Sequence, residues 1–541
     1  MRGLMSDWPL LISRLIEHAA HFHGDTEIVS RLVDGGIHRY TYADAERRSR
    51  RLARALQRLG IRPGDRVGTL AWNTYRHFEL YYGISGVGAV CHTINPRLFD
   101  EQIVYIVNHA QDRLLFIDTS FVPLVERLRP QFPAQTRIAL LEPAETSFPV
   151  AGCYDELVAA ESEEGFAWPE FDEREAAALC YTSGTTGNPK GVLYSHRSTL
   201  LHTFGASLPS SIPMTAGDVV CPIVPLFHAC GWGTAYTAPM NGAKLVYPGP
   251  RLDGASLYDL FEAEGVTLSL GVPTVWLGFE AYLREKRVRC STLRMILSGG
   301  SAVPPSLIDA YENRGIEVLQ GWGMTEMSPL GTVTALKAKH LQLDAAGKRA
   351  IKAKAGRPVF GVEMKIVDDE GRPQPHDGKA VGELLVRGPW IVSGYFENPE
   401  ASAAAVEHDG WFRTGDVAAI DPDGYLQIAD RRKDVIKSGG EWISSIDLEV
   451  AAMAHPDVAE AAAIAVPHPR WGERPLLIVT PRGDRRPERA TLTAFLGERF
   501  PRWMLPDDVI VLDELPHTAT GKVMKTRLRE EYGAHKLPAA G

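Results

Sequence analysis

The eleven residues YTSGTTGNPKG at positions 181–191 combine three glycines, four small hydroxyl side chains and one lysine. Glycines let backbone N–H groups converge on an anion, hydroxyls add neutral donors, and Lys190 supplies a positive charge. The Walker pattern is excluded because Pro189 precedes the lysine and Gly191 follows it. By itself, such a run is equally compatible with a polar turn. A buried-strand pattern at residues 176–181 and a helix start at Ser195 favour a phosphate-binding loop between them.

The composition is that of an ordinary globular protein. The chain has 541 residues, of which 45% are hydrophobic and 23% charged, so it is long enough for two or more domains. Its net charge of −9 provides no basic field, which argues against a nucleic-acid partner. No apolar run approaches the roughly 20 residues of a transmembrane segment. Six cysteines without a CxxC pair predict reduced thiols in a cytoplasmic protein: Cys91, Cys153, Cys180, Cys221, Cys230 and Cys290.

Helix-like and strand-like patterns alternate along the first part of the chain. Apolar residues at helical spacing over residues 41–60 lead into a strand pattern at 66–71. The alternation continues with helices expected at 77–88 and 101–110 and with strands expected at 90–94 and 114–118. Such regular alternation predicts an α/β fold with layered, mainly parallel sheets.

The pattern changes after residue 330. A polar helical stretch is expected from residue 335, and strand patterns at 363–367 and 382–387 then predict a β-rich subdomain. Five charged residues at 430–434 lie between two apolar patterns and indicate a domain boundary. Beyond them, helix, strand and helix patterns within residues 446–500 predict a small α+β domain of about 110 residues.

Further blocks follow the glycine-rich loop in a fixed order: LQGWGMTE at 319–326, GWFRTGD at 410–416, KSGGEWI at 437–443 and TATGK at 518–522. Together with the loop, this ordered set resembles the adenylate-forming superfamily of acyl-CoA synthetases, luciferases and peptide-synthetase adenylation domains over nearly the whole chain. The resemblance implies a large N-terminal domain, residues 1–430, and a small mobile C-terminal domain, residues 431–541. The family's hinge position matches Lys433.

The resemblance implies a site for ATP and Mg²⁺. The nucleotide would be bound by Thr182, Ser183, Gly184, Thr185, Thr186, Gly187, Lys190, Gln320, Gly321, Trp322, Thr325, Asp416 and Arg431. The metal would be held by Thr182 and Glu326, since a carboxylate is a hard oxygen ligand. Asp416 would accept hydrogen bonds from the vicinal ribose hydroxyls. Trp322 stands where the family usually has tyrosine, which keeps a stacking surface for the base and removes a hydroxyl.

The catalytic residues that the resemblance implies are Lys522, Thr182, Glu326 and His228. Lys522 alone would be read as a flexible exposed lysine. In the family it is a mobile ammonium that bridges the carboxylate and the α-phosphate and neutralises charge as the two anions approach. Coenzyme A would be bound by Gly439, Gly440, Glu441 and Trp442, where the glycines leave room for pantetheine.

The stretch PLFHACGWG at residues 225–233 bears on the substrate. It contains no acidic residue, so an amino acid, whose ammonium needs a carboxylate partner, is disfavoured. The resemblance places the acyl pocket at His228, Trp232, Gly299, Gly300 and Ser301. The blocks are most similar to those of long-chain fatty acyl-CoA synthetases and methylthiopropionate-CoA ligases. The implied reaction is ATP- and CoA-dependent activation of a medium- to long-chain fatty acid through an acyl-adenylate, with release of AMP and pyrophosphate.

Three alternatives stay open. The acid could be a short thioether acid, 3-methylthiopropionate, or an aryl acid, since chain length is not readable from these residues. The chain could instead be a nucleotide-binding regulator without catalysis, although Glu326, Asp416 and Lys522 argue against that. The long-chain relatives pair through an N-terminal segment, which implies a homodimer.

Overall fold

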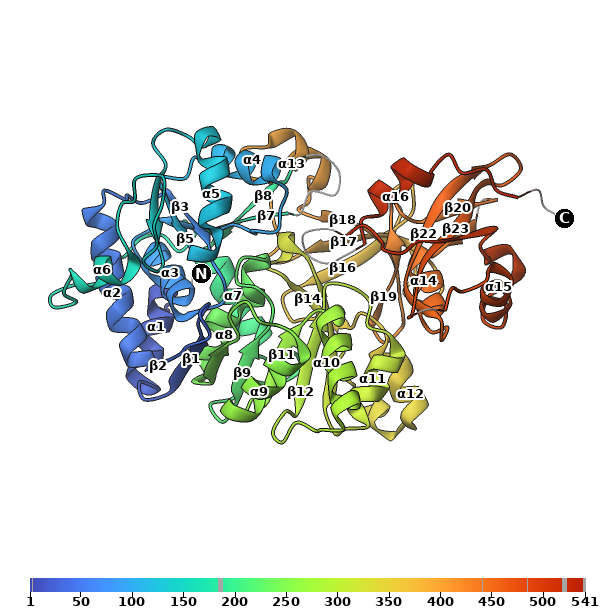
Figure 1. Ribbon diagram of the computed structural model, residues 1–541, viewed down its shortest axis with the longest axis horizontal. Helices are drawn as coiled ribbons and strands as arrows, with labels where there is room; N and C mark the ends of the chain where they lie inside the picture. The colour runs from blue at the N-terminus through green and yellow to red at the C-terminus, as the bar shows by residue number, and fades with distance from the viewer. Residues whose placement is uncertain (2, 183–187, 440, 484, 518–522, 539–541) are drawn as a thin grey trace.

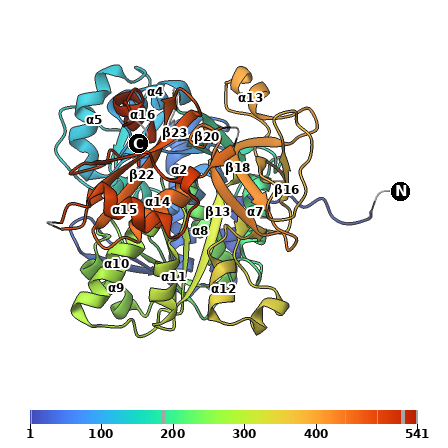
Figure 2. The same cartoon turned by 90° about the vertical axis from the view of Figure 1, so that its right-hand side faces the viewer.

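The computed structural model describes residues 1, 3–182, 188–439, 441–483, 485–517 and 523–538. Two large sheets and a smaller one form the N-terminal part, and a separate C-terminal unit lies on the right of Figure 1. Turned by 90°, the N-terminal residues extend away from the large domain (Figure 2). Within the described residues, no helix is long and apolar enough to cross a membrane.

The first large sheet has six strands and carries the ends of the glycine-rich loop. Its order is β6 (Arg137–Leu140), β5 (Leu114–Ile117), β3 (Arg66–Leu70), β4 (Val90–Thr93), β7 (Ala176–Tyr181) and β8 (Gly191–Ser195). All neighbours are parallel except β7 and β8, which form an antiparallel pair. The strand β8 was not expected from the sequence. The buried Val192 and Tyr194 alternate with the exposed Leu193 there, which is the pattern of a half-buried strand.

The second large sheet has nine strands. Its order is β15 (Arg357–Pro358), β14 (Leu330–Val333), β13 (Glu317–Gly323), β12 (Met295–Gly299), β11 (Leu268–Gly271), β9 (Val219–Pro222), β10 (Lys244–Tyr247), β1 (Glu27–Arg31) and β2 (Ile37–Thr41). The six central strands, from β13 to β1, are parallel to one another. The layered, mainly parallel arrangement predicted from the sequence is confirmed.

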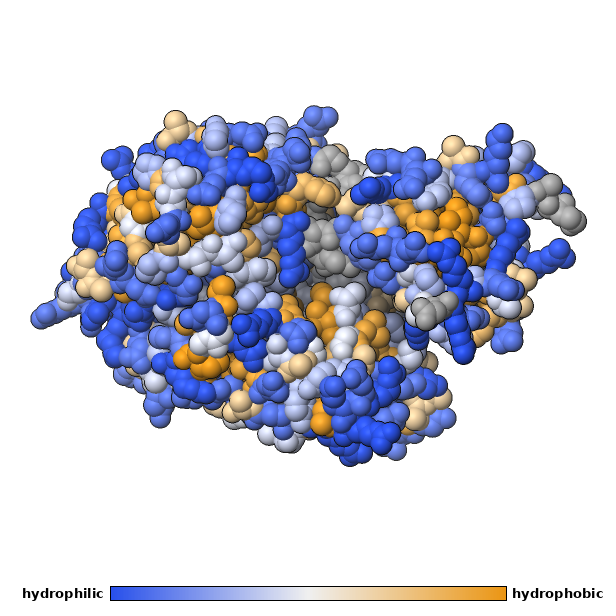
Figure 3. Space-filling model, in the orientation of Figure 1, coloured by the Kyte–Doolittle hydropathy of each residue, from blue (hydrophilic) through white to orange (hydrophobic). Residues whose placement is uncertain are grey.

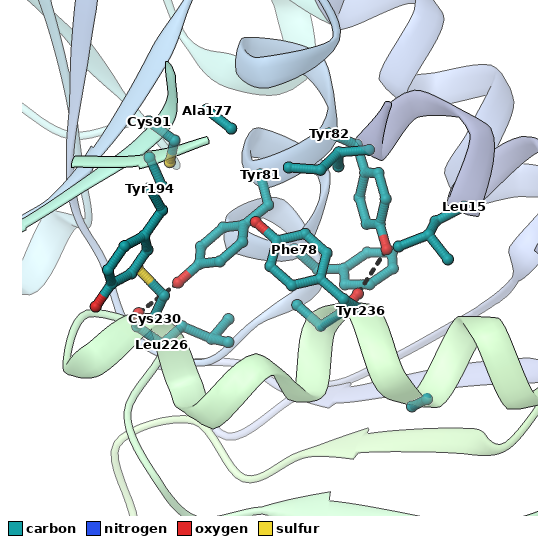
Figure 4. Close-up of a cluster of buried hydrophobic side chains, with 14 of the residues drawn as sticks. Leu15, Phe78, Tyr81, Tyr82, Cys91, Ala177, Tyr194, Leu226, Cys230 and Tyr236 are labelled. Atoms are coloured by element: carbon teal, nitrogen blue, oxygen red, sulfur yellow. Dashed lines mark hydrogen bonds between the residues drawn. The ribbon is translucent and has the colours of Figure 1, made fainter. Parts of the chain in front are cut away.

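The helix α3 (Tyr75–Gly86) is buried at every residue because it packs against both large sheets and against α2 (Tyr42–Arg58). Its ring-bearing residues Phe78, Tyr81 and Tyr82 fill the core in Figure 4. The other helices of the large domain are α1 (Ile12–Phe22), α4 (Asp100–Ala110), α5 (Val122–Leu128), α6 (Tyr154–Ala159), α7 (His196–Ala206), α8 (Thr234–Asn241), α9 (Gly254–Glu264), α10 (Pro273–Lys286), α11 (Pro305–Glu312), α12 (Ala345–Lys352) and α13 (Pro399–Ala405).

The predicted β-rich subdomain is an antiparallel sheet of four strands, β16 (Glu363–Val367), β17 (Gly382–Arg387), β18 (Phe412–Ile420) and β19 (Leu426–Arg431). The helical stretch expected from residue 335 begins later than predicted. A 3₁₀ turn over Ala338–Gln342 comes first, and the α-helix α12 begins only after Asp344, whose carboxylate accepts from Gly347 N. The aspartate cap therefore sets the helix start, as expected for this residue type.

The C-terminal unit is built on a second antiparallel sheet. Its strands are β20 (Ile436–Ser438), β21 (Glu441–Ile443), β22 (Val458–His468), β23 (Gly472–Pro481) and β24 (Asp508–Val511), and its helices are α14 (Ser445–Met453), α15 (Arg489–Gly497) and α16 (Lys525–Tyr532). Only β24 pairs in parallel, along β23. The chain passes from the sheet of β19 to the sheet of β20 between Arg431 and Ile436. The expected small α+β unit is therefore present.

Candidate active site

The glycine-rich loop joins β7 to β8 as the loop of a hairpin. Thr182 and Lys190 close it, because Thr182 N donates to the Lys190 carbonyl at 2.9 Å and Lys190 N donates to Thr182 Oγ1 at 3.1 Å. The Lys190 ammonium lies 4.9 Å from the ring centre of Tyr395. The predicted phosphate ligands between them lie outside the described residues: Ser183, Gly184, Thr185, Thr186 and Gly187.

Glu326 is held from two sides in a short 3₁₀ turn, Thr325–Met327, next to β14. The residue is 6% exposed, and the Tyr395 hydroxyl donates to its Oε1 at 2.8 Å. The Tyr194 hydroxyl, from β8, donates to the Thr325 carbonyl at 2.6 Å, which ties this turn to the hairpin of the glycine-rich loop. Burial raises the pKa of Glu326 despite the Tyr395 hydrogen bond. The site therefore holds a carboxylate that a cation would stabilise.

Three elements meet at Asp416. It lies on β18 opposite Arg431 of β19, and the Arg431 Nε contacts Asp416 Oδ1 at 2.8 Å. From β13 of the large sheet, Trp322 Nε1 donates to Asp416 Oδ2 at 3.0 Å. Two of the predicted nucleotide ligands therefore hold the third in place.

Gln320 and Gly323 show how closely β13 approaches its neighbours. A side chain at Gly323 would come within 1.9 Å of the Pro329 carbonyl oxygen, so only glycine fits there. Gln320 is 6% exposed, and no described group donates to its buried Oε1. A buried acceptor without a donor is rare and points to a missing ligand or water.

The acyl side of the site is built on an unusual turn, Ala229–Gly233. Every residue in it has a positive φ, between 37° and 73°, although Ala229, Cys230 and Trp232 carry side chains that disfavour this conformation. The Tyr81 hydroxyl donates to the Leu226 carbonyl at 2.5 Å just before the turn. Figure 4 shows Tyr81 pointing from α3 toward Leu226 and Cys230.

Trp232 occupies space that the sequence analysis assigned to the acyl chain. A side chain at Gly299 would meet the Trp232 indole at 3.0 Å, so the gap left by this glycine is filled by the ring. Gly300 has a φ of 87°, and it and Ser301 are exposed. An acyl chain that passes Gly299 therefore requires a different position of Trp232.

The predicted hinge and CoA residues lie on the C-terminal side. Lys433 is exposed in a turn that Asp434 N closes by donating to the Arg431 carbonyl at 2.8 Å. Gly439 has a φ of 62°, and its N–H donates to the Trp471 carbonyl at 2.8 Å. Glu441 is exposed, and the Lys437 ammonium lies over the half-buried Trp442 ring. Gly440 and Lys522 lie outside the described residues.

Helix α16 follows residues 518–522 closely and is fixed to the C-terminal unit by a buried ion pair. Lys525 Nζ lies 2.6 Å from Glu449 of α14, and both side chains are largely buried. Arg529 on the same helix forms an ion pair with Asp434, next to the hinge residue. His517 and Val523, the described residues on either side of 518–522, pair with each other on the C-terminal unit.

A cavity of about 2100 Å³ lies between the large domain and the C-terminal unit. It is lined by Thr182, Lys190, His228, Trp232, Gly299, Gly300, Ser301, Gln320, Gly321, Trp322, Thr325, Glu326, Asp416, Arg431 and Lys433. The structure thus gathers the described nucleotide, acyl and hinge residues in one place. Gly439, Glu441 and Trp442 do not line it. Figure 3 shows the two parts side by side, with hydrophilic residues over most of this face.

Sequence reasoning did not find the tyrosines that position the site. Tyr395 contacts Glu326, Tyr194 contacts the turn before it, and Tyr81 supports the acyl turn. Their sequence neighbourhoods carry no acid–base motif, and the alternation of β8 was the only available signal for Tyr194. These roles depend on contacts between residues 69 to 145 positions apart.

Comparisons with known proteins agree with this geometry. Residues 16–396 match the AMP-binding enzyme family, and residues 447–522 match the AMP-binding enzyme C-terminal domain. The chain is 50% identical to a 3-methylmercaptopropionyl-CoA ligase of Ruegeria lacuscaerulensis, covering 98% of this chain and 99% of that one. It is 46% identical to a medium-chain-fatty-acid–CoA ligase of Ectopseudomonas oleovorans, with 98% of each covered.

The fold is also that of a solved structure, the anthranilate CoA ligase AuaEII in complex with anthranoyl-AMP. The two match with a TM-score of 0.85 over 97% of this chain and 99% of that chain, at 24% identity. The two domains match in the expected order, and the relatives are similar along the whole chain, so these comparisons all indicate the same family. The chain belongs to the AMP-binding enzyme family, in the acyl-CoA synthetase branch of the adenylate-forming superfamily.

Proposed function

We propose that the protein activates a medium- to long-chain fatty acid in two steps: carboxylate and ATP give acyl-AMP and pyrophosphate, then acyl-AMP and coenzyme A give acyl-CoA and AMP. The observation that carries the proposal is the shared cavity. Polar groups suited to a nucleotide, among them Asp416 and Gln320, open into the same space as an apolar pocket beside Trp232. In the first step an oxygen of the fatty acid attacks the α-phosphorus, and the pyrophosphate leaves.

The nucleotide end of the cavity supports ATP as the phosphate donor. Asp416 has one protein partner on each oxygen, Trp322 through a hydrogen bond and Arg431 through an ion pair, and each oxygen keeps a lone pair for a ribose hydroxyl. The unsatisfied Oε1 of Gln320 can accept from the exocyclic amine of adenine. Lys190 and the loop that Thr182 closes would then lie toward the β- and γ-phosphates.

Glu326 and Thr182 fit a magnesium ion that arrives with ATP. Among the residues that the structure describes, no three histidine, cysteine, aspartate or glutamate side chains come together as metal ligands. Mg²⁺ is commonly held by one or two carboxylates together with substrate phosphates and waters, so one buried carboxylate suffices. When bound, the ion neutralises charge on the phosphates. Glu326 supplies the carboxylate, and Tyr395 fixes its orientation.

The acyl end of the cavity is apolar. Its lining includes Ile212, Ile223, Val224, Leu252, Val272 and Val303. His228 lines the cavity and would lie beside the reacting carboxylate, and the surrounding stretch at 225–233 offers no acidic partner for an ammonium group. Lys522, delivered by the C-terminal unit, would bridge the carboxylate and the α-phosphate in the first step. The face with Gly439, Gly440, Glu441 and Trp442 would receive coenzyme A in the second.

A short thioether acid is the second candidate. The 3-methylmercaptopropionyl-CoA ligase is slightly more similar to this chain than the medium-chain fatty acid ligase, at 50% against 46% identity. A thioether is also apolar, so the same pocket would accept it. The position of Trp232 against Gly299 favours a short acid in this conformation, because the ring fills that space.

A panel of acids decides between these substrates. CoA-dependent AMP release is measured with propionate, 3-methylthiopropionate, benzoate, octanoate and palmitate. We expect kcat/KM to rise from propionate to octanoate. A clear preference for 3-methylthiopropionate over octanoate selects the second candidate, and a preference for benzoate selects an aryl acid. Equal rates from propionate to palmitate contradict the assignment of the apolar pocket.

Two further properties belong to the proposal. We expect a cytoplasmic enzyme, since ATP and coenzyme A are cytosolic substrates and the six cysteines are free. We also expect a homodimer that pairs through the N-terminal segment, which extends from the large domain and exposes Leu4, Met5 and Trp8. Light scattering tests the dimer, and a monomer mass contradicts it.

A further inference from the structure

We infer that Trp322 is a positioning residue for the ribose: its indole N–H holds the carboxylate of Asp416 so that it accepts the two vicinal hydroxyls of ATP. The consequence is a preference for ribonucleotides over 2′-deoxyribonucleotides that depends on residue 322. This inference rests on the proposed function, since it assigns a role within the same nucleotide site. It goes beyond stacking of the base, for which any aromatic ring would suffice.

The Asp416 carboxylate keeps about half of its hydrogen-bond acceptor sites free. Trp322 Nε1 donates to Oδ2 at 3.0 Å and Arg431 Nε forms an ion pair with Oδ1 at 2.8 Å, so each oxygen has one protein partner. A carboxylate has about four acceptor sites. One site therefore remains on each oxygen, and a pair of neighbouring hydroxyls can donate to both. The Asp416 side chain is 4% exposed, so water competes little for these sites.

The indole of Trp322 is held in place by the neighbouring strand, β14. Trp322 pairs with Thr332 of β14, and a side chain at Gly331 would meet the Trp322 ring at 2.9 Å. The ring thus lies against the backbone of β14, where any residue larger than glycine would displace it. Because the protein structure itself fixes the ring, the N–H points at Asp416 before a nucleotide arrives. Such preorganisation lowers the cost of ordering the site on binding.

The test variant is Trp322→Phe, which keeps an aromatic ring and removes the N–H. Pyrophosphate release gives the KM for ATP and the KM for its 2′-deoxy analogue. A hydrogen bond to a charged group is worth enough that the KM for ATP should rise about 10-fold. The KM for the 2′-deoxy analogue should rise less, since one of its two contacts to Asp416 is already missing. The KM for the 2′-deoxy analogue divided by the KM for ATP should therefore fall about 3-fold or more toward unity.

Trp390→Phe is the matched control. Trp390 is also buried, and its Nε1 donates to the Leu330 carbonyl at 2.9 Å, so this change removes an equivalent indole hydrogen bond away from Asp416. It should lower thermal stability and leave the ratio between the KM values unchanged. A double variant, Trp322→Phe with Asp416→Asn, should be no worse for ATP than Asp416→Asn alone, because Trp322 acts through Asp416.

Equal increases in both KM values in Trp322→Phe would overturn the inference and leave Trp322 as a stacking surface. Where this variant does not fold, Trp322→Met removes the N–H with a flexible side chain, and the same ratio is measured. Calorimetric binding of ATP and its 2′-deoxy analogue gives the answer without turnover. Absence of pyrophosphate release by the wild-type protein with every acid defeats the proposed function instead, so the two failures are distinguishable.

Discussion

The large domain and the C-terminal unit hold their functional groups in different ways. On the large domain, Glu326 and Asp416 are more than nine-tenths buried, and each accepts hydrogen bonds from side chains of other elements. On the C-terminal unit, Lys433, Gly439 and Glu441 are exposed, and ion pairs fix the helix that follows residues 518–522. One part holds its groups in buried positions fixed by side-chain hydrogen bonds. The other presents its groups on surface segments.

This difference suggests a division of labour. A buried carboxylate with fixed partners stabilises charge without moving, which is the usual source of large electrostatic effects. Surface segments on a separate unit can be exchanged between two steps by rotation at a short connection. Changes on the large domain should therefore affect ATP use in every assay that starts from free acid, whereas changes on the C-terminal unit should separate the two half-reactions.

The largest effect is expected for Lys522→Ala. Loss of the bridging charge should slow pyrophosphate release about 10²–10³-fold, or roughly 3–4 kcal/mol. Thioester formation from synthetic acyl-adenylate and coenzyme A should change by less than about 3-fold, because the bridging charge acts before this step. Both rates are measured on the same preparation. Lys536→Ala, an exposed lysine of the same unit, serves as the control. Equal loss of both rates in a folded variant refutes the division between the two half-reactions.

A loss of about 100-fold is expected for Glu326→Gln on the large-domain side. The amide keeps an acceptor for the Tyr395 hydroxyl and removes the charge that a magnesium ion needs. Pyrophosphate release is measured at saturating acid and over a range of Mg²⁺ concentrations. Glu264→Gln is the control, since Glu264 is also buried but pairs with Arg39 and Lys244 far along the second sheet. Unchanged activity in Glu326→Gln rules out the proposed metal ligand.

A smaller effect, about 10-fold, is expected for Tyr395→Phe. The hydroxyl donates to Glu326 Oε1 at 2.8 Å, so its loss should raise the Mg²⁺ concentration for half-maximal rate without abolishing activity. Tyr154→Phe is a close match, because the Tyr154 hydroxyl donates to the buried Glu79 carboxylate at 2.6 Å on the other side of the large domain. It should cost stability and leave the Mg²⁺ dependence unchanged. The same Mg²⁺ shift in both variants would point to a general loss of packing.

The same contrast explains what the sequence could predict. Repeating patterns and local caps were sufficient for the layered sheets, and the strand at 176–181 is β7 residue for residue. Glu326, Asp416 and Trp322, which line the cavity, could be proposed as site residues because they lie in short blocks with a recognisable order. Tyr395, which donates to Glu326, and Tyr194, which donates to the Thr325 carbonyl, were not singled out, because they lie 69 and 131 positions away from these partners in the sequence.

Backbone conformation was the second feature that could not be predicted from the sequence. The sequence analysis placed Trp232 and Gly299 in one acyl pocket, but it did not predict that the left-handed turn at Ala229–Gly233 sets the Trp232 ring against Gly299. Nothing local in that turn predicts positive φ at Ala229 and Cys230, since neither residue favours it. Distant contacts, such as that of the Tyr81 hydroxyl with Leu226, support this conformation. Strain of this kind follows from tertiary packing and cannot be read from neighbouring residues.

The smallest expected effect concerns stability, and it has opposite signs at two buried carboxylates. Burial raises the pKa of Glu326, so the folded protein keeps this proton to a higher pH than the unfolded chain does. Its contribution is favourable below the ordinary carboxyl range and is lost as pH rises through the raised pKa. For Glu264, burial alone would raise the pKa, but hydrogen bonds from Arg39 and Lys244 lower it, so its contribution is present at neutral pH and lost on acidification.

Melting temperatures of the ligand-free variants test this directly. Glu326→Gln, which removes the buried charge, should melt roughly 2 °C above the wild-type protein at pH 8, with a smaller difference at pH 5. Glu264→Gln should melt below wild type at pH 8, because it breaks a paired charge, and this difference should also shrink at pH 5. Saturating Mg²⁺ and ATP should reverse the order for Glu326→Gln, since binding stabilises the wild type more. If Glu326→Gln melted below the ligand-free wild type at pH 8, the Glu326 carboxylate would have to be paired with a cation in solution. That result would contradict a buried carboxylate that gains its cation only when Mg²⁺ binds.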